Sequence, residues 1–357
     1  MLSVLILLLT SGVTSSLGLP RPSTPIAVHR SLLSMEWNQS ASTAEWSTRR
    51  DFGSVVYEGN VFVIGGCNPG AIGDVWSSSD HGVSWDLVTS SASFGARCAL
   101  TSVVLNDKIY VMAGKGDSYL SDVWSSNDGG LTWTRETEAA GWAGRQYHES
   151  VVHNNKIYLM GGYNGGNFND VWSSSDGAVW TQVTASAGWD ARRDFSLVSY
   201  GNKLVVLGGY GTGFLQDVWA SDDGAITWEL VTVIPGWSAR SLHSAVVNDN
   251  SIYVIAGVDS SGEMNDMWTS SDAGASWNLI EFSAIWGVRR SHSSVIYNGE
   301  IYVMGGHNGG SYLNDVWSLD VGGIRPSSNR PIMTAISSLW VYGNIAAMGY
   351  VAYRYIA

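Results

Sequence analysis

Three arginine pairs are the most promising candidates for chemistry in this sequence, because arginines at this spacing can bind an anion. The pairs begin at Arg49, Arg192 and Arg289, and two of them belong to a repeated string, "RRDF". A guanidinium offers several N–H donors in one plane and matches the two oxygens of a carboxylate. We expect the second arginine of each pair to bind an anionic peptide or a glycan, namely Arg50, Arg193 and Arg290. A second interpretation stays open, in which these arginines pair with adjacent acids such as Asp51 and Asp194.

The elements that hold these arginines are predicted to be short β-strands. The chain has 357 residues, of which 45% are hydrophobic and 14% charged, with 42 glycines, 18 tryptophans and 7 prolines. Glycine permits tight turns and tryptophan packs on pleated surfaces, so the composition indicates an all-β fold. The formal net charge of -12 argues against a surface that binds a phosphate backbone. We therefore expect no nucleic-acid partner.

A tryptophan-containing motif recurs six times along the chain. The triplet "DVW", once written "DMW", appears at spacings of 48, 48, 47, 49 and 49 residues. Each copy follows an alternating apolar run that ends in two small residues, such as "IYVMGG", and this alternation is strand periodicity. Repeats of this length are typical of solenoids and propellers. The aspartates of the triplets are Asp74, Asp122, Asp170, Asp217, Asp266 and Asp315.

An arginine also recurs in every unit, 17 residues before the glycine that ends the apolar run. An aromatic residue stands three positions before each of these arginines. Each unit then consists of four antiparallel strands joined by turns, which is one propeller blade. We therefore predict a six-bladed β-propeller over residues 35–320. Six equivalent copies favour a structural role for the repeated arginines, which are Arg49, Arg97, Arg145, Arg192, Arg240 and Arg289.

The order of arginine, apolar strand, "IYVMGG" and "LNDVW" resembles the kelch repeat, and the resemblance covers roughly residues 35–320. The turn after each "DVW" also resembles the Asp box of sialidase-like propellers, S-x-D-x-G-x-x-W. Three copies are intact, the third copy along the chain is one residue short, and the fourth has Ala225 in place of glycine. Such boxes are structural in that family, so the resemblance implies no catalytic role for them.

The sixth unit lacks its last strand, and the start of the chain can supply it. In every complete unit the tryptophan of the last strand precedes the next repeated aromatic residue by nine positions, and Trp37 precedes Trp46 by the same nine. We therefore predict that "MEWNQSA", around Trp37, pairs with the strand around Trp317. This pairing would close the ring and leave no free sheet edge there.

The kelch resemblance implies that the loops after the second and fourth strands of each blade share one face. Departures from sixfold symmetry on that face are the place to look for a ligand. We expect a monomeric propeller that binds a protein or glycan partner there. The candidate binding residues are Arg50, Arg193, Arg290, Asp51, Asp194, Tyr147, Tyr163, Tyr210 and His307.

A carbohydrate-active enzyme is the alternative to a binding protein. A sialidase needs an arginine clamp, a tyrosine with a carboxylate partner and a separate acid, and the sequence does not place the last groups. A copper site like that of galactose oxidase needs tyrosine, histidine and a cross-linking cysteine, which do not cluster. Three histidines share one strand position that is commonly histidine in kelch repeats, so we predict no metal and no cofactor; they are His148, His243 and His292.

The chain has two cysteines, Cys67 and Cys98. One follows the Gly-Gly of the first blade and the other opens the first strand of the second, so both belong to the same face of adjacent blades. We predict that they form a disulfide, provided that their Cα atoms lie within about 7 Å of each other.

The two ends of the chain suggest the secretory pathway. Residues 1–18 resemble a signal peptide, with an apolar stretch before small polar residues, although a buried first strand is the alternative. Residues 19–34 and 321–330 are expected linkers. Residues 331–353 carry no charge and are a candidate transmembrane helix before a short tail, 354–357, with packing on the ring as the alternative. We expect the propeller outside the cell, with a sequon at Asn38 that permits glycosylation.

Overall fold

The computed structural model describes residues 36–322, which form strands and turns. The expected signal peptide, the linker 19–34, the candidate transmembrane segment 331–353, the tail and most of the linker 321–330 lie outside the described residues. Within residues 36–322 no helix is long and apolar enough to cross a membrane. The strands form six antiparallel sheets of four strands each, so the predicted all-β class is confirmed.

Each of the first three blades takes its strands from one continuous part of the chain. Blade one contains β2 (Gly53–Tyr57), β3 (Asn60–Asn68), β4 (Gly70–Ser78) and β5 (Asp86–Thr89). Blade two contains β6 (Thr101–Leu105), β7 (Lys108–Met112), β8 (Val123–Ser126) and β9 (Thr134–Thr137). Blade three contains β10 (Glu149–His153), β11 (Lys156–Met160), β12 (Val171–Ser174) and β13 (Thr181–Thr184).

Blades four and five repeat this order, and blade six borrows its outer strand. Blade four contains β14 (Ser196–Tyr200), β15 (Lys203–Tyr210), β16 (Phe214–Ser221) and β17 (Glu229–Thr232). Blade five contains β18 (Ser244–Asn248), β19 (Ser251–Asp259), β20 (Gly262–Ser270) and β21 (Asn278–Glu281). Blade six contains β22 (Ser293–Tyr297), β23 (Glu300–His307), β24 (Tyr312–Asp320) and β1 (Asn38–Ala41).

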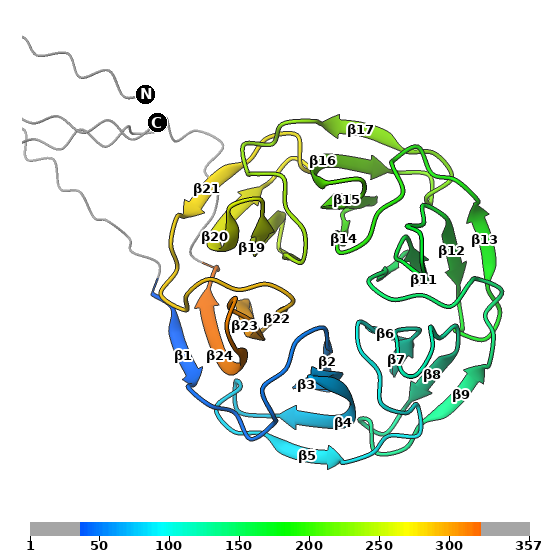
Figure 1. Ribbon diagram of the computed structural model, residues 1–357, viewed down its shortest axis with the longest axis vertical. Helices are drawn as coiled ribbons and strands as arrows, with labels where there is room; N and C mark the ends of the chain where they lie inside the picture. The colour runs from blue at the N-terminus through cyan, green and yellow to red at the C-terminus, as the bar shows by residue number, and fades with distance from the viewer. Residues whose placement is uncertain (1–35, 323–357) are drawn as a thin grey trace, which may run out of the picture. The chain divides into compact units, whose positions relative to one another are not determined.

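The blades stand in a ring with the first strand of each at the centre (Figure 1). Each first strand contacts the first strand of the next blade, and β22 of blade six contacts β2 of blade one, so the ring is closed. The predicted six-bladed propeller is confirmed. Blades one and four therefore face each other across the central channel, as do blades three and six.

The predicted closure by the N-terminal segment is also confirmed. Strand β1 pairs antiparallel with β24, with Gln39 opposite Trp317. Trp37 lies just before β1 and packs edge-on against Trp286, which begins the sixth unit. The side chain of Asn38 is exposed on this outer strand.

An ion pair inside each blade explains the spacing of the repeated arginine. In blade one the guanidinium of Arg49 lies 2.6 Å from Asp74 and donates to the carbonyl oxygen of Gly65. The second carboxylate oxygen of Asp74 accepts a bond from the indole N–H of Trp76, two residues on. The arginine thus ties the start of the unit to two of its strands. The six equivalent pairs are Arg49–Asp74, Arg97–Asp122, Arg145–Asp170, Arg192–Asp217, Arg240–Asp266 and Arg289–Asp315.

The turns between the third and fourth strands are held by the aspartate that the pattern S-x-D-x-G-x-x-W contains. In blade one Asp80 accepts N–H bonds from Val83 and Ser84, and the indole of Trp85 donates to the carbonyl of Gly82. The short third copy keeps the same indole bond, from Trp180. In the fourth copy Ala225 adopts a φ of 70°, which glycine would reach with less strain. The likeness of these turns to sialidase Asp boxes stays a prediction.

Candidate functional site

A set of six backbone bridges contains six of the nine predicted binding residues. In each blade the residue after the repeated arginine exchanges two backbone hydrogen bonds with the residue after the second glycine. We call these twelve residues the rim. The bridges are Arg50–Cys67, Cys98–Lys115, Gln146–Tyr163, Arg193–Tyr210, Ser241–Val258 and Arg290–His307.

The Arg193 cluster is an arginine held between two aromatic rings. The guanidinium carbon of Arg193 lies 4.6 Å from the ring centroid of Tyr163 and 4.9 Å from that of Tyr210. One of its N–H groups donates to the side-chain oxygen of Asn167 at 3.0 Å. The side chain nevertheless remains 28% exposed. The sequence prediction named both tyrosines but missed Asn167, because a lone amide in a glycine-rich loop carries no distinguishing signal.

The Arg50–Arg290 cluster lies between blades six and one. Arg50 stacks over the ring of Tyr312 at 5.7 Å, and the rings of Tyr312 and His307 lie 5.4 Å apart. Arg290 is 3.4 Å from Glu263, which also lies 3.9 Å from His307. Blades one and six lie across the ring from blades four and three (Figure 1). This cluster and the Arg193 cluster therefore belong to opposite sides of the ring.

The geometry is compatible with both interpretations of the second arginine in each pair, namely binding of an anion and pairing with the adjacent acid. Arg50 lies 3.3 Å from Asp51, and Arg193 lies 3.3 Å from Asp194, so each approaches its adjacent acid. The arginines remain about a third exposed, whereas the side chain of Asp51 is only 4% exposed. Each aspartate is thus directed inward while its arginine stays at the surface.

A closed circle of backbone hydrogen bonds surrounds the channel mouth. At each step the N–H of one blade donates to the carbonyl oxygen of the equivalent residue in the preceding blade. All six residues have a positive φ although none is glycine, which is a strained conformation for most side chains. We call them the mouth ring. They are Asp51, Ala99, Tyr147, Asp194, Leu242 and Ser291.

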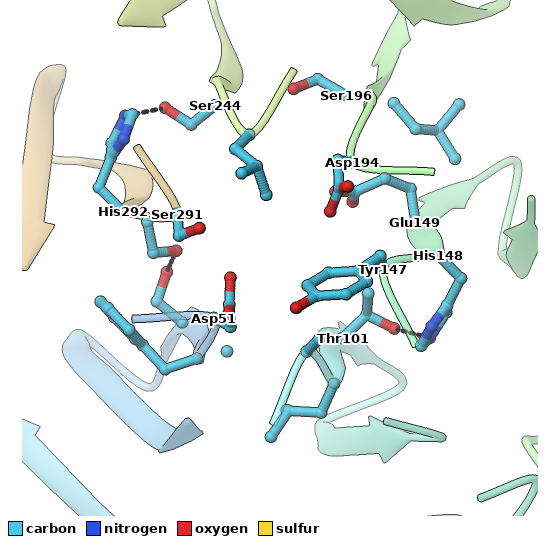
Figure 2. A pocket seen from close by; sticks show the side chains of 18 of the residues that line it. Asp51, Thr101, Tyr147, His148, Glu149, Asp194, Ser196, Ser244, Ser291 and His292 are labelled. Atoms are coloured by element: carbon cyan, nitrogen blue, oxygen red, sulfur yellow. Dashed lines mark hydrogen bonds between the residues drawn. The ribbon is translucent and has the colours of Figure 1, made fainter. Parts of the chain in front are cut away.

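Below the mouth ring lies a central cavity of about 250 Å³. Four consecutive residues from every blade line it, and the rim arginines are not among them. Figure 2 shows acidic groups and Tyr147 reaching into this space from blades one, three and four. The acids are Asp51, Asp194 and Glu149, of which the sequence prediction missed Glu149. The sequence does distinguish Glu149, because this acid is the first residue of β10, whereas the first strands of the other blades begin with glycine, serine or threonine.

Burial weakens the acidity of these groups. Desolvation, together with the charge of Asp51, raises the pKa of Asp194 to about 8. Desolvation and the charge of Asp194 raise the pKa of Glu149 to about 8. Burial also raises the pKa of Asp51, against the opposing effect of Arg50, and it raises the pKa of Tyr147. At neutral pH Glu149 and Asp194 are therefore largely protonated.

The three equivalent histidines are buried between blades. Desolvation lowers the pKa of His148 and of His243 to about 3, and it lowers the pKa of His292 as well. Thr101 pairs with the Nε2 atom of His148, and Ser244 with that of His292. Across residues 36–322 no three histidine, cysteine or acidic side chains gather as a metal site would require.

The two cysteines form a disulfide between Cys67 of blade one and Cys98 of blade two, with Cα atoms 5.3 Å apart. This confirms the predicted bond. It also means that neither cysteine is available for the thioether cross-link of a galactose-oxidase-like copper site. The bond joins two adjacent rim bridges.

The sialidase alternative requires an anion clamp and carboxylates that face one substrate. Here Tyr147 and the three acids line the cavity, whereas Arg50, Arg193 and Arg290 lie on the rim outside that lining. Because Arg50 and Arg193 also lie 3.3 Å from Asp51 and Asp194, the sialidase alternative stays an untested prediction.

Comparison with known proteins agrees with this geometry. The model of the KLHDC2/KLHL20/DRC7 Kelch-repeats domain matches residues 25–209 and 148–323. No curated protein matched the chain. The two matched ranges together cover all six blades and the closing strand. The chain belongs to the family of kelch-repeat propellers.

Proposed function

We propose that the propeller binds a protein partner through the rim, and that acidic side chains of the partner contact Arg50, Arg193 and Arg290. A kelch propeller fits a protein-binding scaffold in general. The observation that carries the finer proposal is the Arg193 cluster, in which an exposed guanidinium is already fixed in place.

Pre-organisation is the first argument for this use of Arg193. A free arginine side chain loses rotamer freedom when it binds, which costs roughly 0.5 to 1.5 kcal/mol. Stacking between Tyr163 and Tyr210, with a bond to Asn167, has already restricted the side chain. A carboxylate of the partner can therefore bind Arg193 with little further ordering.

The available charge is the second argument. Asp194 approaches Arg193, but its pKa of about 8 leaves it mostly protonated at neutral pH. Burial also raises the pKa of Asp51 beside Arg50. Asp194 therefore cancels only part of the positive charge of Arg193, and an anionic ligand can compete for it.

A peptide fits the rim better than a glycan does. Sugars bind by stacking on free aromatic faces, yet Tyr163 and Tyr210 each have one face against Arg193, and Tyr312 has one against Arg50. The glycan interpretation therefore depends on the arginines alone. The binding screen that tests the proposal therefore includes glycans as well as proteins.

We also propose that the protein belongs to the secretory pathway, with the propeller outside the cell. The Cys67–Cys98 disulfide supports this location, because such bonds persist in oxidising compartments. The signal-like residues 1–18, the apolar segment 331–353 as a membrane tether, glycosylation of Asn38 and a monomeric state remain parts of the same proposal.

The test is a binding screen against secreted proteins and immobilised glycans. Wild type is compared with Arg50→Ala, Arg193→Ala and Arg290→Ala, and with Arg135→Ala as a matched control. Arg135 is an exposed arginine on the outer strand β9, where it lies over the ring of Trp124 and 3.7 Å from exposed Glu138. We expect each rim variant to weaken binding of an acidic protein ligand about tenfold or more, and the control to bind as wild type. Equal binding by all five proteins would reject the proposal.

A further inference from the structure

We propose that the central cavity binds a primary ammonium group, such as the end of a lysine side chain, between Asp51, Glu149 and Asp194. This site lies next to the rim, whose Arg50 and Arg193 approach two of its acids, and it takes a ligand of opposite charge. It does not depend on the rim proposal being correct.

Three acids from three blades line one central cavity. Asp51 comes from blade one, Glu149 from blade three and Asp194 from blade four, and all of them line the cavity (Figure 2). Glu149 differs from the other two acids because no positively charged side chain within residues 36–322 forms an ion pair with it. Burying a carboxyl group in this way is unfavourable unless a partner joins it.

Buried polar atoms without a partner are a second observation. The Oδ1 atom of Asp194 is buried and accepts no hydrogen bond from any residue in the described part of the chain, whereas the Oδ2 atom of Asp51 lies 3.3 Å from Arg50. The hydroxyl of Ser291, beside them in the mouth ring, has no partner there either. Leaving buried polar groups without a hydrogen-bond partner is unfavourable. A ligand with several donors would satisfy these atoms together.

An ammonium group matches this arrangement better than a metal ion does. It carries three N–H donors and a positive charge, and it tolerates hydroxyl neighbours. The walls supply hydroxyls from Thr101, Ser196 and Ser244. A metal ion would need three close ligands, and residues 36–322 contain no such group. The cavity of about 250 Å³ has room for several water molecules, and therefore for an alkyl chain.

The positive groups nearby do not occupy the site. Arg50 and Arg193 approach Asp51 and Asp194 from the rim and are not among the residues that line the cavity. Desolvation keeps the pKa of each buried histidine well below neutral, so His148, His243 and His292 add no charge. Tyr147 faces the acids as a neutral phenol, because its pKa is raised.

Binding must be linked to proton release. Glu149 and Asp194 each have a pKa near 8, so the empty cavity holds protons that a bound cation would displace. For one acid with that pKa the deprotonated fraction rises about tenfold from pH 7 to pH 9. The ammonium of lysine stays charged over this range, so its affinity should rise about tenfold.

Calorimetric titration of the full-length protein with Nα-acetyl-lysine amide tests the site, with Nα-acetyl-norleucine amide as the uncharged control ligand. We expect saturable binding of the lysine compound alone, with proton release in buffers of different ionisation heat. Glu149→Gln should weaken it at least tenfold, whereas Glu138→Gln, an exposed acid on the outside of the ring, should not. No binding by wild type, equal binding of both ligands, or full binding by Glu149→Gln would overturn the proposal.

A second variant guards against a folding defect. Asp194→Asn removes another acid of the cavity while keeping its shape. If Glu149→Gln fails to fold, a matching loss in folded Asp194→Asn supports the site, and wild-type affinity in that variant rejects it.

Discussion

Trp37 lies edge-on against Trp286 with 5.6 Å between the ring centroids, although the two residues stand at opposite ends of the propeller sequence. Trp85 meets Trp46 in the same way within blade one, at 5.9 Å. The first tryptophan of the described chain is therefore the missing fourth-strand tryptophan of the last blade. The ring is closed by side-chain packing as well as by the pairing of β1 with β24.

This closure predicts a stability effect at the start of the chain. Trp85→Ala should cost about 3 to 5 kcal/mol, because Trp85 is buried, and Trp37→Ala somewhat less, because Trp37 is half-buried. Urea unfolding of both variants measures the difference. A Trp37→Ala variant as stable as wild type would contradict closure by this segment.

Replacement of two adjacent arginines, Arg192 and Arg193, should lower the free energy of unfolding by very different amounts. Arg192 is fully buried and pairs with Asp217, so Arg192→Ala leaves a buried charge unpaired and should cost about 3 to 5 kcal/mol. Arg193→Ala removes a partly exposed group and should cost about 1 kcal/mol or less. Chemical denaturation distinguishes them. Similar losses in both variants would show that the second arginine is structural as well.

The disulfide should stabilise the contact between the first two blades. It links cysteines 31 residues apart, and closing a loop of that length is worth about 3 to 4 kcal/mol through the unfolded state. The double variant Cys67→Ser, Cys98→Ser should unfold at a lower denaturant concentration, and its free energy of unfolding should be lower by that amount. Intact-mass measurement after thiol labelling checks the bond itself, and two labelled thiols in unreduced protein would disprove it.

The contribution of Glu149 to stability should fall as the pH rises from about 4 to about 8. Its pKa is near 4.3 when unfolded and about 8 when folded, so the native state keeps this proton across an interval in which the unfolded state loses it. Asp194 contributes in the same direction. Glu149→Gln cannot lose that proton and should unfold at a higher temperature than wild type at pH 8, with the difference shrinking toward pH 4.

Thermal unfolding across this pH range, with Glu138→Gln as the control, gives the comparison. The control acid is exposed, so its variant should follow the wild-type curve. A Glu149→Gln curve parallel to that of wild type would contradict the assignment of Glu149 as a buried, protonated acid.

The six-bladed fold was predictable from the sequence because each repeated residue makes a contact inside its own blade. The spacing of Arg49 and Asp74 is fixed by one ion pair, and the position of Trp37 follows from the tryptophans of the other blades. The disulfide followed from topology, since both cysteines belong to neighbouring rim positions.

The centre of the molecule was harder to predict because its contacts join different blades. The mouth ring depends on backbone hydrogen bonds, so its members share no side-chain type and range from Ala99 to Tyr147. Glu149 and Tyr312 acquire their roles from residues far away in the sequence. Repetition shows where such positions lie but not which charges meet across the channel.

The most direct test of the rim proposal is selection of peptides from a random display library. The bait is wild type or a variant with Arg50, Arg193 and Arg290 all changed to Gln. The account predicts that wild type enriches peptides rich in Asp and Glu, and that the variant does not. The same acidic sequences enriched by both proteins, or no acidic preference with wild type, would contradict it.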